Sequence, residues 1–325
     1  MKLGIYLSGA CGQSKNLYRA RNEAKRGRAC FETVNKQAKE DSKHLIQTQE
    51  SKDFSYIIDP QFLFYDLLQP FAEQMQKVQL GPQENWFNNN LFYRRPQIEG
   101  PLKKLSSSFM QDYLHTDLLK EKKSMAILPS PYTLLSLSNI SGYQNKKEAI
   151  CNLSSIIRHE AELLIKKGFS RIQFDEPTIA IKQSLGSLKE DDLKLLSISI
   201  NELSPLQGAS TSLHTYFGDV GPLIPFLIKL PIDCIGIDCT ETCQRDILKH
   251  NFSEKELALG LVNSRTPAME NVNKIIDKIQ KIAITTSPKK IYLTPNTGLE
   301  YIGWTLGNEK LSILELVKKG FEHAQ

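Results

Sequence analysis

Two adjacent acidic side chains end one of the most aliphatic stretches of the chain. The segment RIQFDEP (171–177) runs from apolar residues into Asp175 and Glu176. Neighbouring side chains on a strand point to opposite faces, so only one of these carboxylates can face a site at the strand end. Such a carboxylate could bind an ammonium group or act as a base, while the other pairs with a neighbouring loop. We predict that Asp175 is catalytic and that Glu176 contributes to substrate binding.

Two other segments end in groups that could ligate a metal ion. His214 and Tyr216 share one face of TSLHTYF (211–217), and Asp238 follows the aliphatic run of CIGIDCT (234–240). His and Asp are common zinc ligands and Tyr is a poor one, whereas a zinc site needs four ligands or three plus water. His214 and Asp238 are therefore candidate catalytic residues and candidate metal ligands in an incomplete set.

The elements that must position these residues alternate along the chain. Aliphatic segments are separated by stretches in which apolar residues recur every three or four positions, which predicts parallel strands joined by helices. Eight such units with polar residues at the strand ends predict an α/β fold of the (β/α)8 TIM barrel type. A doubly wound open sheet is the alternative, but no GxGxxG motif follows the first strand. The expected strands are residues 3–9, 56–61, 125–131, 171–177, 211–217, 234–240, 257–263 and 290–298, and the clearest helices are 149–168, 270–283 and 310–324.

We expect residues 1–325 to form a single barrel with long insertions after strands one and two. The insertions cover residues of about 12–53 and 67–122, far more than the usual connection between a strand and a helix. Loops that follow barrel strands lie on the face that carries the chemistry. The insertions should therefore cover the C-terminal face of the barrel.

The first insertion begins with a basic cluster, and the second contains aromatic residues. Between Lys15 and Arg28 the sequence contains six basic residues and only one acidic residue. This cluster could attract phosphates or a polyglutamate tail, or it could simply be a solvated helix face. The aromatics around Trp86 could stack on a planar ligand or pack the loop against the protein.

Composition restricts the class of protein. The 325 residues carry a net charge of +5 (41 basic minus 36 acidic) and six cysteines, none of them in a CxxC pair. No apolar run approaches the roughly 20 residues that span a bilayer. The first residues, MKLGIYLSG, resemble a buried strand more than a signal peptide. We predict a cytoplasmic protein with reduced thiols that acts on small molecules and binds neither membrane nor nucleic acid.

Five motifs carry a resemblance to a known family. QFDEP, HTYFG, LPIDCIGIDCT, ALGLVNSR and LTPNTGL, in this order, resemble the barrel signatures of cobalamin-independent methionine synthases. The resemblance implies a barrel that transfers a methyl group from methyltetrahydropteroyl-polyglutamate to homocysteine. In that family a strand-five His-x-Cys pair, a strand-six Glu and a strand-eight Cys bind the zinc that activates the thiol. The corresponding residues are His214, Tyr216, Asp238 and Thr297, so zinc is possible, but both thiolates are absent and no cofactor is firmly implied.

The same resemblance assigns substrate contacts. The family aspartate that holds the amino group of homocysteine falls on Asp175, and a backbone contact falls around Ser8. Tyr216 and Thr297 stand where the family has ligands, so they are expected to meet the substrate.

TYFG and LVNSR resemble more closely the family's N-terminal barrel, which lacks zinc and holds the polyglutamate tail with basic residues near its start. Lys15, Arg19 and Arg21 lie in the comparable region, and the insertion aromatics, Trp86 among them, could stack on the pterin ring or pack the loop down.

These assignments lead to one main hypothesis and three alternatives. The chain would be the zinc-less half of a synthase, active in methyl transfer beside a separate zinc-bearing barrel. Alternatively it is a non-catalytic module that binds folate or a partner, or a methyltransferase with a divergent metal site or a corrinoid donor. A further alternative is a barrel that acts on another methylated substrate with Asp175, His214 and Asp238 as acid and base groups.

Overall fold

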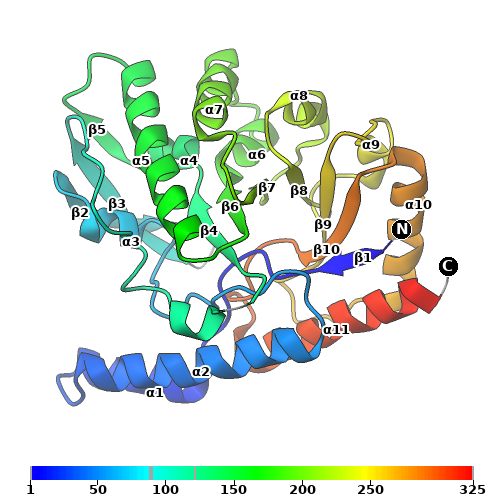
Figure 1. The fold of residues 1–325 in the computed structure, drawn as a ribbon, viewed down its shortest axis with the longest axis horizontal. Helices are drawn as coiled ribbons and strands as arrows, with labels where there is room; N and C mark the ends of the chain where they lie inside the picture. The colour runs from blue at the N-terminus through cyan, green and yellow to red at the C-terminus, as the bar shows by residue number, and fades with distance from the viewer. Residues whose placement is uncertain (1, 88–90, 121, 324–325) are drawn as a thin grey trace.

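A curved sheet of parallel strands forms the centre of the computed structural model, which describes residues 2–87, 91–120 and 122–323. Helices pack around the sheet (Figure 1), which confirms the predicted α/β class. Hydrogen-bonded neighbours follow the order β1-β10-β9-β8-β7-β6-β4. These strands are β1 (Leu3–Ile5), β4 (Met125–Pro129), β6 (Arg171–Asp175), β7 (Ser210–Thr215), β8 (Cys234–Asp238), β9 (Glu256–Val262) and β10 (Lys290–Pro295).

The segment predicted as the second strand, 56–61, is not a regular strand. Ile57 makes a single parallel bridge to the residue before β4, and the Ser55 amide donates a hydrogen bond of 2.8 Å to a β1 carbonyl. Gln61 adopts a φ of +62°, and its amide donates to the Asp59 carboxylate at 2.7 Å. The chain therefore turns away from the sheet after residue 58, which shortens the predicted strand.

The strands and helices follow from the sequence pattern. Every residue of β4, β6 and β8 is buried, as expected for parallel strands covered on both faces. The helix predicted at 149–168 is α5, which begins earlier because the Asn145 side chain accepts the Glu148 amide. The helices are α1 (Lys15–Lys25), α2 (Phe31–Ser51), α3 (Gln69–Gln74), α4 (Pro131–Ser136), α5 (Lys146–Lys166), α6 (Pro177–Ser184), α7 (Glu190–Leu203), α8 (Ile224–Lys229), α9 (Gln244–Ile247), α10 (Val272–Thr286) and α11 (Gly303–His323), with 3₁₀ turns η1 (Thr116–Leu119) and η2 (Gly221–Leu223).

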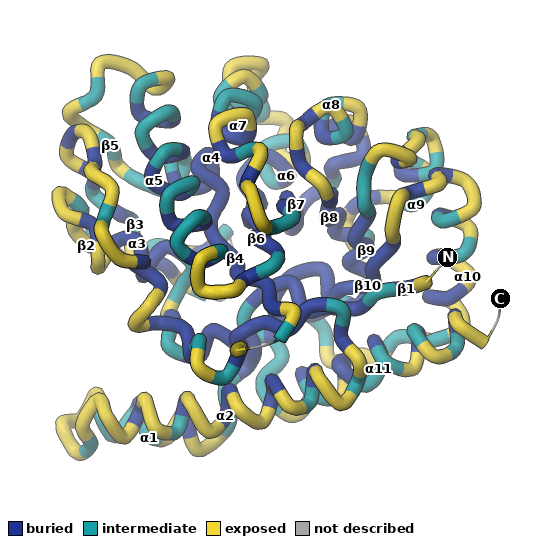
Figure 2. Tube along the Cα trace, viewed as in Figure 1, coloured by how far each residue is buried: buried dark blue, intermediate teal, exposed yellow. Residues whose placement is uncertain are grey.

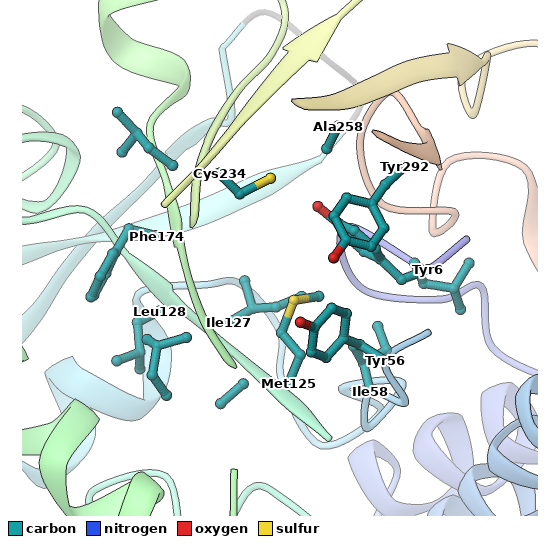
Figure 3. Close-up of a cluster of buried hydrophobic side chains, with 14 of the residues drawn as sticks. Tyr6, Tyr56, Ile58, Met125, Ile127, Leu128, Phe174, Cys234, Ala258 and Tyr292 are labelled. Carbon is teal, nitrogen blue, oxygen red and sulfur yellow. The ribbon is translucent and has the colours of Figure 1, made fainter. Parts of the chain in front are cut away.

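The guanidinium of Arg171 is buried among tyrosine rings beside the curved sheet. Arg171 is fully buried, pairs with Glu256, and lies 4.3 Å from the ring centre of Tyr56 and 5.1 Å from that of Tyr292. The rings of Tyr6, Tyr56 and Tyr292 gather in the same cluster (Figure 3), with centroids 5.3 to 6.1 Å apart. Ion pairing and ring faces together compensate the desolvation of the guanidinium.

Both expected insertion regions contain regular structure. Helices α1 and α2 pack together along one side of the molecule with their outward faces exposed (Figure 2). The second region forms a small sheet of β2 (Val78–Asn85), β3 (Phe92–Glu99) and β5 (Asn139–Ser141), which the sequence did not predict because Gly81, Pro82 and Pro96 interrupt its strands. Among the described residues, no helix combines the length and the apolar character needed to cross a membrane.

Candidate active site

A cavity of about 600 Å³ lies beyond the carboxyl ends of several parallel strands. One wall consists of strand-end residues: the segment 9–15 after β1, Asp175 after β6, Tyr216 after β7 and the segment 297–300 after β10. Other walls come from α1, from the segment 61–67 and from the β2–β3 hairpin. Ligands in parallel α/β folds bind at this end of the strands, so this cavity is the candidate active site.

Asp175 is held at the cavity wall by two side-chain donors. The Gln173 amide donates to one carboxylate oxygen at 2.7 Å, and the Tyr216 hydroxyl donates to the other at 3.1 Å. Only 5% of Asp175 is exposed, and this burial raises the pKa of its carboxyl to about 7. Tyr216 therefore lines the cavity with its hydroxyl directed to Asp175. A carboxylate in this setting can bind an ammonium group or exchange a proton near neutral pH.

Glu176 points to the other side of the strand end, as strand alternation requires. It is fully buried, and its carboxylate accepts the hydroxyl of Ser130 and, at 3.1 Å, the amide of Ile179 in the first turn of α6. Burial raises the pKa of Glu176 to about 7. The structure thus places Glu176 at the N-cap of α6, outside the cavity lining.

Glu300 also lines the cavity and was not anticipated from the sequence. Burial, with a smaller contribution from the charge of Asp175, raises the pKa of Glu300 to about 8. Its Oε2 is the one cavity-lining carboxylate oxygen of the described residues that is buried without a hydrogen-bond partner. The sequence carried no signal for it, because Glu300 lies beyond the end of β10, where strand alternation no longer predicts direction.

Ser8 and Thr297 lie where β1 and β10 approach each other. The Ser8 hydroxyl donates to the carbonyls of Pro295, at 2.8 Å, and Thr297, at 3.3 Å. A Cβ at Gly9 would lie only 2.7 Å from the Cα of Gly298, so this approach requires glycine. Gly9 and Thr297 line the cavity, whereas the Ser8 side chain is used in joining the two chain segments.

His214 lies in the protein interior, outside the cavity lining. It is 3% exposed, its Nε2 is 2.8 Å from the Tyr6 hydroxyl, and its ring lies against the Cα of Gly236, where a Cβ would be 2.5 Å away. Burial, together with the charge of Arg171, lowers the pKa of His214 to about 3. The imidazole is therefore neutral, and it is not among the residues that line the cavity.

Asp238 is occupied by the loops around it. Its carboxylate accepts the Thr240 hydroxyl at 2.7 Å, the Phe217 amide at 3.2 Å and the Asn296 side-chain amide at 3.3 Å. Burial raises the pKa of Asp238. Its oxygens hold together the ends of three strands, and it lies outside the cavity lining.

The candidate zinc ligands are not brought together within the described part of the chain. No group of three or more His, Cys, Asp or Glu side chains in the described part of the chain is arranged to hold a metal ion. The two candidate ligands, His214 and Asp238, are engaged with Tyr6 and with loop donors, and Tyr216 and Thr297 supply no thiolate.

The basic cluster contributes one wall of the cavity. Lys15, Arg21 and Lys25 of α1 line it, while Arg19 is exposed and lies outside the lining. Arg21 is buried, donates to the Phe62 carbonyl and stacks 4.9 Å above the Tyr65 ring. Burial lowers the pKa of Arg21. The cavity therefore has cations on α1 and carboxyl groups at the strand ends.

Trp86 both packs the hairpin and lines the cavity. It is 7% exposed and makes edge contacts with Phe87 and Tyr93, with centroids 4.9 and 5.6 Å away. Phe92 from β3 lines the cavity next to it and is exposed. An aromatic wall of this kind suits a planar ligand.

Comparison with known proteins gives consistent matches. The family model described as the cobalamin-independent synthase, catalytic domain, matches residues 8–318. A methionine synthase of Saccharolobus solfataricus is 22% identical over 269 residues, which cover 79% of this chain and 78% of that protein. The 5-methyltetrahydropteroyltriglutamate–homocysteine methyltransferase of Streptococcus thermophilus is 26% identical over 255 residues, 76% of this chain but 32% of that longer protein.

Solved structures share the fold. A B12-independent methionine synthase from Shewanella sp. W3-18-1, in complex with selenomethionine, superposes with a TM-score of 0.80 at 17% identity, covering 100% of this chain and 99% of the other. A putative vitamin-B12-independent methionine synthase from Listeria monocytogenes gives a TM-score of 0.78 at 17% identity, again covering 100% and 99%.

Proposed function

The chain belongs to the cobalamin-independent methionine synthase family, and from this premise we propose that its cavity transfers a methyl group from a folate-type donor to homocysteine. The observation that carries the proposal is the combination of groups in one cavity. Asp175 at the strand ends suits the ammonium of an amino acid, and Lys15, Arg21 and Lys25 suit the carboxylates of a polyglutamate tail. Trp86 would stack on the pterin.

Other predicted residues have supporting roles in this proposal. Tyr216 orients Asp175 through its hydroxyl, and the close approach at Ser8 and Thr297 shapes the wall beside it. His214 and Asp238 would act as positioning groups outside the cavity lining, Asp238 by accepting the amide of Phe217, the residue after Tyr216. Arg19 is exposed on α1 and would attract a long anionic tail. Glu176 supports Asp175 indirectly by anchoring α6 directly after it.

The proposal includes the architecture and the setting. The Ser55 amide donates to a β1 carbonyl, and the Ile57 carbonyl accepts the first amide of β4. These bonds connect the segment 55–58 to both strands and support closure of the sheet into an eight-stranded barrel. Residues 1–325 would be one such barrel, with the insertions at about 12–53 and 67–122 covering its C-terminal face. A cytoplasmic location with reduced thiols is part of the same proposal.

A second proposal concerns the missing zinc ligands. Because Tyr216 and Thr297 replace thiolates, the chain would be the zinc-less half of a synthase that works beside a separate zinc-bearing barrel. This proposal and the single-chain enzyme differ in one outcome, which is whether the purified chain makes methionine alone.

The test uses untagged chain, homocysteine and 5-methyltetrahydropteroyl-triglutamate, with metal analysis of the same preparation. We expect methionine to form in this cavity, so Asp175→Asn should greatly reduce product formation at low homocysteine concentration. Product only after addition of a zinc-bearing barrel would establish the split synthase, and product only from a methyl-corrinoid would establish the other donor. Binding of the folate without product under any condition would identify a binding module and refute the catalytic proposal.

A further inference from the structure

The acceptor thiol needs a base in this chain. A free thiol has a pKa of about 8.5 and is only a few per cent thiolate at pH 7, so it reacts slowly without activation. The family's metal lowers that pKa by coordination. Tyr216 and Thr297 cannot replace a metal-bound thiolate, and the candidate ligands His214 and Asp238 lie outside the cavity lining.

Glu300 has the position that such a base requires. It follows Thr297 by three residues, in the connection between β10 and α11, and it lines the same cavity as Asp175 and Tyr216. Its carboxylate folds back over Gly298, where Oε2 occupies the space that a side chain at Gly298 would need. Glycine at this position therefore allows the carboxylate to lie at the cavity wall rather than in solvent.

The other acidic groups of the cavity are already engaged. Asp175 accepts hydrogen bonds on both oxygens, and Asp66 accepts the amides of Leu68 and Gln69 at 2.8 and 2.9 Å. Burial raises the pKa of the Cys11 thiol far above its usual value, so this group stays protonated. Oε2 of Glu300 has no such partner among the described residues. A buried acceptor without a donor is costly, and a substrate S–H group would supply the donor.

We propose that Glu300 is the general base that removes the proton from the acceptor thiol in this chain. The inference rests on the proposed function, because it assumes that methyl transfer to homocysteine takes place in this cavity. Only four bonds separate the amino nitrogen of homocysteine from its sulfur. An ammonium group on Asp175 therefore keeps the sulfur near the neighbouring carboxylate of Glu300.

The step balances without a further reactant. The S–H bond breaks, the proton passes to Oε2 of Glu300, and the electron pair stays on sulfur. Sulfur then forms a bond to the methyl carbon, the C–N bond of the donor breaks, and its electron pair remains on nitrogen. That nitrogen takes a proton from solvent, and Glu300 returns its proton to solvent, so the carboxylate is regenerated.

Electrostatics match the carboxylate to this task. Burial raises the pKa of Glu300 to about 8, close to the value of the thiol, which makes proton transfer nearly balanced in energy. An ammonium group at Asp175 would favour the ionised form of Glu300 in the complex. The rate at low substrate concentration should therefore rise with pH through about 8, and the rate at saturation should rise at lower pH.

The experiment compares Glu300→Gln with wild type on two acceptors, homocysteine and selenohomocysteine, whose more acidic selenol is ionised at neutral pH. We expect Glu300→Gln to reduce kcat for homocysteine about 100-fold or more, and to leave the rate for selenohomocysteine close to wild type. Homocysteine affinity, measured by calorimetry, should change little. Glu300→Asp should recover part of the rate, and Glu309→Gln, a change at an exposed glutamate of α11, should have no effect.

Each alternative result decides the question. Equal loss with both acceptors, or weaker homocysteine binding at unchanged kcat, would overturn the role as base and indicate a structural or recognition role. Activity that appears only with an added zinc-bearing barrel would also overturn it, while methyl transfer itself would stand. A wild-type chain that transfers methyl to neither acceptor would refute the proposed function together with this inference.

Discussion

Replacing Asp175 with Asn gives the most direct test of substrate recognition. The variant removes the negative charge and keeps an amide oxygen as acceptor, while the donors Gln173 and Tyr216 remain in place. Only 5% of Asp175 is exposed, so an ammonium group that binds its carboxylate must lose most of its hydration water. Truncating one partner of a buried charged pair costs about 2–5 kcal/mol. Homocysteine should therefore bind roughly 30- to 4000-fold more weakly.

The pH dependence of the same equilibrium follows from the pKa of Asp175. Burial raises this pKa to about 7, and only the ionised carboxylate attracts the ammonium. The ionised fraction is then about 0.1 at pH 6 and about 0.9 at pH 8. Affinity in the wild type should therefore increase about tenfold between pH 6 and pH 8. Asp175→Asn should bind weakly and lose this dependence.

Calorimetry with homocysteine and methionine would measure both effects. A ligand without the amino group, 4-(methylthio)butanoate, should bind wild type and Asp175→Asn equally. Asp191→Asn serves as the matched control, because Asp191 is exposed on α7. Equal amino-acid affinity in wild type and Asp175→Asn, or an affinity that does not change with pH, would refute ammonium binding at Asp175.

Two further predictions concern the neighbouring elements. Glu176→Ala removes the N-cap of α6 and the acceptor of the Ser130 hydroxyl, so the free energy of unfolding in urea should fall by about 1–3 kcal/mol. The control Glu190→Ala, at an exposed site, should change it by less than about 0.5 kcal/mol. Equal stabilities of the two variants would contradict the capping role. Changing Lys15 and Lys25 together to Gln should weaken binding of a triglutamate donor roughly 2- to 30-fold at low salt and much less at high salt. Binding of the monoglutamate donor should not change. A competition assay in which both donors bind equally more weakly would argue against tail binding.

The strands of the sheet could be predicted because parallel strands are buried on both faces and contain continuous aliphatic runs. The segment 56–61 was overestimated, since its aliphatic start gave no sign of the positive φ at Gln61 that turns the chain away. The β2–β3 hairpin was missed for the opposite reason. Its strands contain glycine, prolines and few aliphatic residues, and they form only because they pair with each other and with β5.

The candidate site was predictable where alternation along a strand decides direction. Asp175 and Glu176 follow that rule, with one carboxyl in the cavity and the other at a helix N-cap. His214 could not be placed, because its depth depends on Gly236 of the neighbouring strand β8 and on Tyr6, which is far away in the sequence. Glu300 could not be found at all, since its direction depends on the turn after β10.

The raised pKa values of Asp175 and Glu300 connect substrate binding to stability. A carboxyl whose folded pKa lies above its unfolded value contributes stability below the unfolded pKa, near pH 4, and loses it as pH rises through the folded pKa. For this pair that loss falls between about pH 4 and pH 8, because the folded values are about 7 and about 8. An ammonium ligand favours the ionised carboxylates, so it stabilises the folded protein most at the high pH where the unliganded protein has lost this stability. In the proposed mechanism, the carboxyl groups that weaken the unliganded protein at high pH are the ones that would orient the ligand and accept its proton.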